Sequence, residues 1–243
     1  MAAGLQNGEQ HFRLRRLYTL ALADPAAVER CLTTTNETPI MTLPRMWDWD
    51  AIYREGTPVW ETGEPSAELI RFLDEKRIGR GSALDIGCGT GADAIYMVRR
   101  GLEVTAVDNS PTAIERARVR AEQEDALPRF VLADYYEFAQ TSGAFDFAYD
   151  SGLYHYVRQI ELDRYLDALW RVTRPGSYYM TLAAAAGEPI EGSPPPVTKR
   201  QLYNELGRLF EVVRLEPIRM PSLVLKDGYP AWSCLMQRPL LGK

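Results

Sequence analysis

Leu84-Asp85-Ile86-Gly87-Cys88-Gly89-Thr90-Gly91 is the stretch of sequence that decides the fold. It joins a short apolar run, 83–86, to a helical pattern over 92–100, so we expect a buried strand, a glycine turn and a helix in that order. Such a turn lets a ligand approach bare backbone, and the N-terminus of the following helix offers free N–H groups and a partial positive charge. The stretch therefore predicts a ligand site.

Strand and helix patterns alternate beyond this turn. Strand patterns cover 103–107, 129–132, 145–149 and 178–183, and helix patterns cover 111–123 and 160–172. This alternation predicts an α/β fold, a doubly wound and mainly parallel sheet with helices on both faces. The chain ends differently, with a helix after Thr198 and then two strand patterns, 210–216 and about 229–237, that have no helix between them. We expect these two strands to form an antiparallel hairpin at one edge of the sheet.

The overall composition narrows the classes of partner. The chain of 243 residues has 28 basic and 33 acidic side chains, a formal charge of −5, which disfavours nucleic acid as a substrate. Its three cysteines lack paired spacing, so neither a disulfide scaffold nor a metal site is expected. No apolar run approaches the length of a membrane span. We expect a cytoplasmic protein without a membrane partner, and the oligomeric state stays open.

The chain divides by pattern into an N-terminal arm, residues 1–43, and one domain, residues 44–243. The arm contains polar sequence, an amphipathic helical pattern and a threonine-rich linker. It could be a targeting peptide, although its acidic residues disfavour this, or Met41 or Met46 could be the natural start. The role of the arm stays open.

Two acidic residues help to distinguish between the two ligands, a dinucleotide and S-adenosylmethionine (SAM), that a glycine turn of this kind can bind. Gly87, Gly89 and Ala92 also satisfy the G-x-G-x-x-G/A pattern of dinucleotide-binding proteins. Asp108 ends the second strand, where a carboxylate can hold the ribose hydroxyls of either NAD or SAM. Asp85, two residues before the first glycine, would repel a pyrophosphate but could accept hydrogen bonds from the ammonium group of a methionine. Asp85 therefore favours SAM.

The run LDIGCGTGADAIYMVRRGLEVTAVDNSPTAIERAR, residues 84–118, resembles the class I SAM-dependent methyltransferases. The upstream segment Trp60-Glu61-Thr62-Gly63-Glu64-Pro65-Ser66 resembles the W-[DE]-x-G-x-P segment of the thiopurine and tellurite-resistance branch. The resemblance covers roughly residues 47–238 and implies a Rossmann-like sheet of seven strands. It also implies methyl transfer from SAM, with S-adenosylhomocysteine as product, to O, N or S of a small aromatic or thiol-containing molecule.

The resemblance implies a set of cofactor-binding residues at the carboxyl ends of the strands. The glycine turn would cradle the methionine and ribose portions, Asp108 would hold the ribose diol, and Asp134 with Tyr135 would face the adenine. The alternative role of Asp134 is a helix or turn cap. The full expected set is Trp60, Asp85, Gly87, Cys88, Gly89, Gly91, Asp108, Asn109, Ser110, Asp134, Tyr135, Asp150 and Ser151.

The methyl acceptor is expected beside the segment 150–156. SAM carries an activated methyl group, so positioning and desolvation can suffice, with a base needed only for a protonated acceptor. His155 is a candidate base, and Tyr154 could orient the acceptor; the alternatives are a histidine bonded to backbone and a packed tyrosine. The upstream aromatics are a candidate lid over the cofactor: Trp47, Trp49, Tyr53 and Trp60.

Two other functions compete with small-molecule methylation. An RNA or protein methyltransferase is disfavoured because Asp150-Ser151-Gly152-Leu153 stands where the superfamily's methylators of bases and glutamine carry N/D-P-P-Y/F. An NAD-dependent oxidoreductase on a similar glycine turn is a less favoured alternative.

Overall fold

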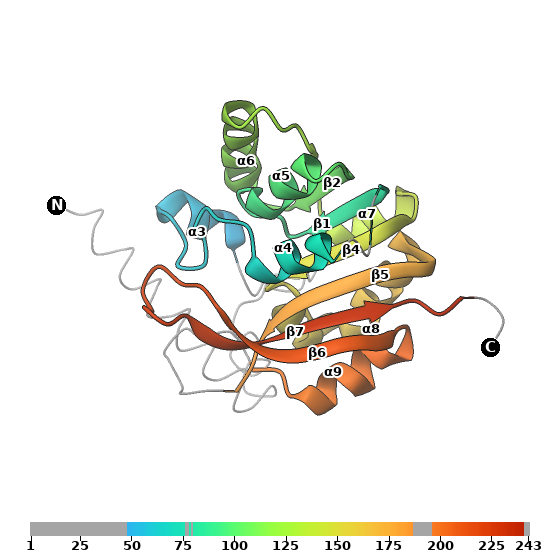
Figure 1. The fold of residues 1–243 in the computed structure, drawn as a ribbon. Helices are drawn as coiled ribbons and strands as arrows, with labels where there is room; N and C mark the ends of the chain where they lie inside the picture. Colours follow the sequence, from blue (N-terminus) through green and yellow to red (C-terminus); the bar gives the residue numbers. More distant parts are fainter. Residues whose placement is uncertain (1–47, 76–77, 79, 187–195, 241–243) are drawn as a thin grey trace, which may run out of the picture. The chain divides into compact units, whose positions relative to one another are not determined.

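The computed structural model describes residues 48–75, 78, 80–186 and 196–240 (Figure 1). The arm expected over residues 1–43 lies outside these ranges, and so does Trp47. Within the described ranges, no helix combines the length and the apolar composition that crossing a bilayer requires.

Helices and strands alternate along the described chain. They are α3 (Trp49–Glu55), α4 (Ala67–Asp74), β1 (Ser82–Ile86), α5 (Ala92–Arg99), β2 (Glu103–Asp108), α6 (Pro111–Gln123), β3 (Arg129–Leu132), α7 (Tyr135–Thr141), β4 (Phe145–Ser151), α8 (Tyr154–Val172), β5 (Thr173–Ala184), α9 (Lys199–Glu205), the 3-10 turn η1 (Leu206–Arg208), β6 (Glu211–Met220) and β7 (Tyr229–Gln237). Caps fix several of the helix starts. Thr198, for example, begins α9 with a capping box in which its side chain and that of Gln201 bond each other's backbone N–H groups.

The strands form one sheet of seven in the order β3-β2-β1-β4-β5-β7-β6. The first five strands pair in parallel, and β7 runs antiparallel to both β5 and β6. The predicted doubly wound, mainly parallel sheet of seven strands with a C-terminal antiparallel hairpin is therefore confirmed. The strand order reverses between β1 and β4, and open α/β sheets bind ligands at the carboxyl ends of the strands at such a reversal.

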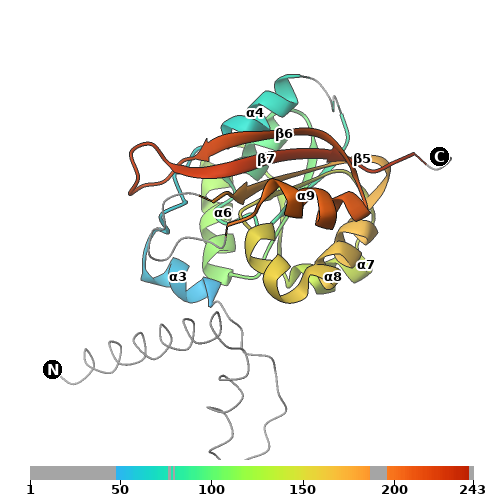
Figure 2. The same cartoon turned by 90° about the horizontal axis from the view of Figure 1, so that it is seen from below.

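Helices cover both faces of this sheet (Figures 1 and 2). Ala83 packs with Phe72 on the face covered by α4 and α5. Leu84 packs with Leu169 on the face covered by α7, α8 and α9. Because successive side chains of a strand point to opposite faces, Asp85 belongs to the α4–α5 side.

The structure differs from the sequence prediction in several elements. Helices α3, α4 and α7, of seven or eight residues each, were not predicted. Helix α8 begins at Tyr154 rather than at residue 160, and non-helical backbone at Glu161 joins two helical segments. Strand β5 includes residues 174–176, where a turn was expected. Strand β6 runs through Pro217, where a loop was expected, because it is an edge strand and tolerates a missing N–H donor.

Candidate cofactor and acceptor site

The glycine turn joins β1 to α5 and leaves bare backbone at the carboxyl edge of the sheet. Gly87, Gly89 and Gly91 all have positive φ, of 71°, 53° and 81°. A Cβ atom on Gly91 would lie 3.0 Å from the Phe130 ring, so this glycine also permits close packing. Gly91 precedes the first turn of α5 and supplies no side-chain cap. The N–H groups of that turn are therefore available to a ligand.

Asp85 presents a buried carboxylate oxygen without a partner. The residue is 2% exposed, and its Oδ2 atom accepts no hydrogen bond. Burial raises the pKa of this carboxyl well above its usual range, and repulsion from Asp93 and Asp108 raises it further. An orphaned acceptor of this kind in a folded protein marks a place for a donor that arrives from outside.

Asp108 ties the glycine turn to the loop after β2. Its Oδ2 atom accepts the Gly89 N–H at 2.9 Å, and its Oδ1 atom accepts the Ser110 N–H at 2.8 Å. A carboxylate offers about four lone-pair sites, so Asp108 keeps capacity to accept from a ribose hydroxyl. Asn109 is exposed beside it.

The hydroxyl group of Ser110 already makes hydrogen bonds within the protein. Ser110 is fully buried, and its hydroxyl accepts the Ala113 N–H at 3.0 Å as the N-cap of α6. The same hydroxyl donates to Asp50 Oδ1 at 2.8 Å. The expected role of Ser110 beside the adenosine stays a prediction, and its side chain has a structural role in any case.

Asp134 is the N-cap of α7. Its Oδ1 atom accepts the N–H groups of Tyr136 at 2.9 Å and Glu137 at 3.3 Å, which matches the alternative role given by the sequence. Tyr135 is buried, and its hydroxyl has no hydrogen-bond partner. Recognition of adenine by Asp134 and Tyr135 stays a prediction.

Asp150 lies on the opposite face of the sheet from Asp85. In the β1–β4 register Asp85 pairs with Tyr149, and Ile86 pairs with Asp150, so Asp150 faces the α8 side. Five protein donors fill its two oxygens: the N–H groups of Leu153 and Tyr154 and the hydroxyls of Tyr165, Tyr179 and Thr181. This carboxylate anchors the start of α8 to β5, and no similar anchor holds Asp85. The half-buried Ser151 ends β4 next to it.

Tyr154 and His155 begin α8 with buried side chains. The Tyr154 hydroxyl donates to Glu205 Oε2 at 2.6 Å, toward α9. His155 Nδ1 accepts the Ala184 N–H at 3.0 Å, and burial lowers the pKa of the imidazole to about 3. The ring is therefore neutral near pH 7, with its proton on Nε2. This geometry favours the alternative of a histidine bonded to backbone, and the roles in catalysis stay predictions.

A segment that we call the strap, residues 48–65, is fastened to α6. Asp50 Oδ1 accepts the Thr112 N–H at 2.9 Å. The Arg116 guanidinium donates to the Tyr53 carbonyl at 2.6 Å, and Arg120 donates to the Gly63 carbonyl at 3.0 Å. These bonds hold the strap beside α6, which follows the end of β2 where Asp108 lies.

Aromatic rings of the strap lie together at the start of α8. Trp49 meets Trp60 edge-on at 6.2 Å and Tyr156 edge-on at 4.9 Å between ring centroids. The Trp60 indole donates to the Tyr53 hydroxyl at 3.4 Å. Three of the four aromatics expected in a lid are thus brought together, and Trp47 lies outside the described residues.

Glu61 is a site residue that sequence reasoning missed. Its Oε1 atom accepts the Tyr53 hydroxyl at 2.9 Å and the Thr90 N–H at 3.4 Å, and its Oε2 atom accepts the Thr90 hydroxyl. A Cβ atom on Gly89 would collide with Glu61 and Tyr53. Glu61 therefore rests on the glycine turn itself, and the available signal was its place directly after Trp60 in the family-like segment.

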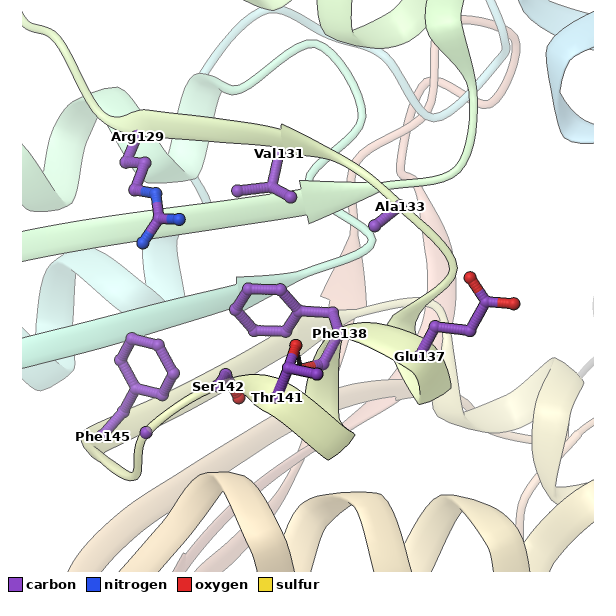
Figure 3. A pocket seen from close by; sticks show the side chains of 9 residues that line it. Arg129, Val131, Ala133, Glu137, Phe138, Thr141, Ser142 and Phe145 are labelled. Carbon is purple, nitrogen blue, oxygen red and sulfur yellow. Dashed lines mark hydrogen bonds between the residues drawn. The ribbon is translucent and has the colours of Figure 1, made fainter.

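A surface hollow of about 550 Å³ lies elsewhere, between β3 and α7 (Figure 3). Val131, Phe138 and Phe145 form its apolar part, and Arg129 and Glu137 lie among its polar lining residues. None of the predicted site residues lines it. We therefore place the candidate site at the glycine turn and not in this hollow.

The residues at the turn fit a cationic amino-acid ligand better than a diphosphate. Asp85 has a buried oxygen without a donor, and Asp93, Asp108 and Glu61 surround it with further negative charge. A pyrophosphate would be repelled, whereas an ammonium group would supply both the missing donor and the opposite charge. The fit to the methionine portion of SAM rests on this arrangement.

Comparison with known proteins identifies methyltransferases as relatives. A family model described as a methyltransferase domain matches residues 83–176. A 2-heptyl-1-hydroxyquinolin-4(1H)-one methyltransferase of Mycobacteroides abscessus is 30% identical over 166 residues, which are 67% of this chain and 73% of that protein.

Solved structures share the fold. A structure from work on conversion of a disulfide bond into a thioacetal group during echinomycin biosynthesis aligns with a TM-score of 0.69 and 25% identity, over 80% of this chain and 91% of the other. The Burkholderia thailandensis 1,6-didemethyltoxoflavin-N1-methyltransferase, solved with 1,6-didemethyltoxoflavin and S-adenosylhomocysteine, aligns with a TM-score of 0.62 and 23% identity, over 78% and 84% of the two chains.

Proposed function

The chain belongs to the class I SAM-dependent methyltransferase superfamily and methylates a small molecule, and from this premise we propose that its acceptor is a planar, hydroxylated or nitrogen-containing heterocycle. The observation that carries the proposal is the cluster of Trp49, Trp60 and Tyr156, of which Trp60 directly precedes Glu61 on the glycine turn where we place the cofactor. Aromatic side chains beside an acceptor favour a flat ring by contact area and by ring–ring geometry. The names of one relative and one structural neighbour, which are a 2-heptyl-1-hydroxyquinolin-4(1H)-one methyltransferase and a 1,6-didemethyltoxoflavin-N1-methyltransferase, support the same class.

The cofactor is SAM, and we propose which residues bind it. Bound SAM supplies a methyl group on a sulfonium centre, which is already activated for transfer. Asp85 would accept from the ammonium group, Asp108 from the ribose hydroxyls, and the N–H groups at the start of α5 would face the carboxylate. Glu61 joins this set as the contact that holds the strap on the turn.

The protein's own contribution to the transfer is positioning and exclusion of water. The strap would cover the cofactor. The loop between β6 and β7 contacts the strap through a 2.8 Å hydrogen bond from the Leu223 N–H to the Val59 carbonyl. We therefore propose that strap and hairpin loop together border the acceptor. An acidic phenol or N-hydroxyl can react as its anion, so a neutral, buried His155 is no obstacle.

The proposal also includes the domain organisation and the location. The arm, residues 1–43, and the methyltransferase domain, residues 44–243, remain the proposed division. The absence of paired cysteine spacing supports a cytoplasmic location. The net acidity supports a small molecule over nucleic acid as the partner.

A panel of acceptors tests the proposal. Hydroxyquinolinones, N-heterocycles, phenols and alkyl thiols would each be assayed for release of S-adenosylhomocysteine. We expect planar heterocycles to be methylated fastest, and Trp49→Leu to raise their KM roughly tenfold through loss of ring contact. Trp170→Leu, which changes an exposed tryptophan of α8, is the matched control and should leave KM unchanged. Methylation of alkyl thiols alone, or an unchanged KM for Trp49→Leu, would contradict the proposed acceptor class.

A further inference from the structure

The Tyr53 hydroxyl is a junction within the strap. The side chain is only 4% exposed, and its hydroxyl donates to Glu61 Oε1 at 2.9 Å. The same hydroxyl accepts the indole N–H of Trp60 at 3.4 Å. A buried hydroxyl needs hydrogen-bond partners, and here one partner is a carboxylate and the other an aromatic ring. Tyr53 therefore ties the ring of Trp60 to the carboxylate of Glu61.

Glu61 connects this junction to the glycine turn. Its Oε1 atom accepts the Thr90 N–H at 3.4 Å, and its Oε2 atom accepts the Thr90 hydroxyl. A Cβ atom on Gly89 would lie 2.7 Å from the Tyr53 hydroxyl oxygen and closer still to Glu61 Oε1. Both groups thus rest on the bare backbone of the turn, and the absence of a side chain at Gly89 is what admits them.

Trp60 extends the series of contacts to the other aromatic rings proposed to border the acceptor. It meets Trp49 edge-on at 6.2 Å between ring centroids, and Trp49 meets Tyr156, near the start of α8, at 4.9 Å. Edge-on ring pairs prefer a particular mutual orientation, so the position of one ring influences the next. A continuous series of contacts therefore runs from the turn, through the Tyr53 hydroxyl, to the aromatic cluster.

The junction is fixed at its backbone but has two long side-chain bonds. Arg116 of α6 donates to the Tyr53 carbonyl at 2.6 Å, which holds the main chain in place. The bond from Trp60 to the Tyr53 hydroxyl and the bond from the Thr90 N–H to Glu61 both measure 3.4 Å. Ordinary N–H···O bonds measure about 2.9–3.0 Å. Both bonds can therefore shorten without movement of the main chain at Tyr53.

We propose that the Tyr53 hydroxyl couples the glycine turn to the ring of Trp60, so that a cofactor bound at the turn fixes the aromatic cluster that borders the acceptor. The inference rests on the proposed cofactor site and assigns Tyr53 to it as a positioning residue, which acts through Glu61 on one side and Trp60 on the other. The cofactor-loaded protein then presents a more rigid surface to the acceptor than the cofactor-free protein does.

Nuclear magnetic resonance of the full chain, isotope-labelled at its tryptophan nitrogens, tests the inference. Each tryptophan contributes one indole N–H signal, and Trp60→Phe identifies the signal of Trp60. We expect saturating S-adenosylhomocysteine to shift this signal, whereas the signal of Trp170, an exposed residue of α8, should stay in place. An unmoved Trp60 signal in the saturated protein would overturn the inference while leaving the proposed function intact.

Removal of the hydroxyl locates the coupling. Tyr53→Phe keeps the buried ring, so S-adenosylhomocysteine should still bind, with a Kd raised by no more than about tenfold for a lost hydrogen bond. Calorimetry measures this Kd, and the shift of the Trp60 signal at saturation should be lost. Tyr203→Phe, at an exposed tyrosine of α9, is the matched control and should retain the wild-type shift. A wild-type shift in Tyr53→Phe would overturn the inference.

A second variant interrupts the series of contacts at the turn, should Tyr53→Phe fail to fold. Thr90→Val removes the hydroxyl that donates to Glu61, so the shift of the Trp60 signal should be reduced at saturating S-adenosylhomocysteine. A full wild-type shift in Thr90→Val would contradict the coupling. Absence of S-adenosylhomocysteine binding to the wild type would instead overturn the cofactor site, and with it the proposed function.

Discussion

At the scale of single residues, two glycines with similar φ angles allow backbone strain to be distinguished from steric crowding of a side chain. Gly91 has φ of 81° and would place a Cβ atom 3.0 Å from Phe130. Gly101 has φ of 89° but nothing lies within 4 Å of its Cβ position. We predict that Gly91→Ala lowers the free energy of unfolding by about 2–4 kcal/mol, from strain plus overpacking, and that Gly101→Ala costs only about 1 kcal/mol. Chemical denaturation measures both, and equal losses would show that packing at the turn has no role.

His155 gives a second prediction, in the dependence of stability on pH. Its pKa is lowered from 6.5 to about 3 in the folded protein. Between these two pH values the histidine is therefore protonated in the unfolded chain but not in the folded chain. Stability is therefore lost as pH falls from about 6.5 toward 3. Between pH 7 and pH 4 the wild type should lose roughly 3 kcal/mol more than His155→Asn, which can still accept from the Ala184 N–H.

The same residue tests the alternative catalytic role. Denaturation curves at several pH values give the difference between wild type and variant directly, so other titrating groups cancel. If wild type and His155→Asn lose the same free energy of unfolding between pH 7 and pH 4, the imidazole is not buried in its neutral form. If His155→Asn also removes an ionisation near pH 6.5 from the profile of kcat/KM, the histidine acts as a base after all.

At the scale of elements, the strap is held on the glycine turn by the bonds between Glu61 and Thr90. We predict that Glu61→Gln weakens this contact by about 1–2 kcal/mol, so amide hydrogens of the strap should exchange roughly tenfold faster. Hydrogen-exchange mass spectrometry measures this on the cofactor-free protein. Glu55→Gln, an exposed acid at the end of α3, is the control and should leave exchange unchanged. Equal protection in Glu61→Gln would show that the strap does not depend on Glu61.

The strap also shows why sequence reasoning found some elements and missed others. Strands β1, β2 and β4 are apolar runs buried on both faces, so their pattern is visible in the sequence. Helices α3 and α4 have seven and eight residues, and their stability depends on caps and on contacts with distant residues. The sequence gives a cap residue such as Ser66, but it does not show which helix follows.

At the scale of the molecule, the positions of the acids could be predicted but their orientations could not. Asp85 and Asp150 are each the last residue but one of a strand, and both were expected at the cofactor. The register of β1 with β4 turns them to opposite faces, where Asp150 meets five donors and Asp85 keeps an oxygen without one. Only pairing across the sheet decides this, so a pattern along one strand could not separate a ligand-binding carboxylate from a structural one.

The central claim is that the buried carboxylate of Asp85 binds the ammonium group of SAM, and calorimetric titration of Asp85→Asn with SAM at pH 7 tests it most directly. The variant replaces a buried carboxyl group that has an oxygen without a partner, so the cofactor-free protein should be at least as stable as the wild type, and chemical denaturation checks this. We predict that the Kd for SAM rises at least about thirtyfold, the loss of one charge-assisted hydrogen bond. A folded Asp85→Asn protein that binds SAM as tightly as the wild type would contradict the claim.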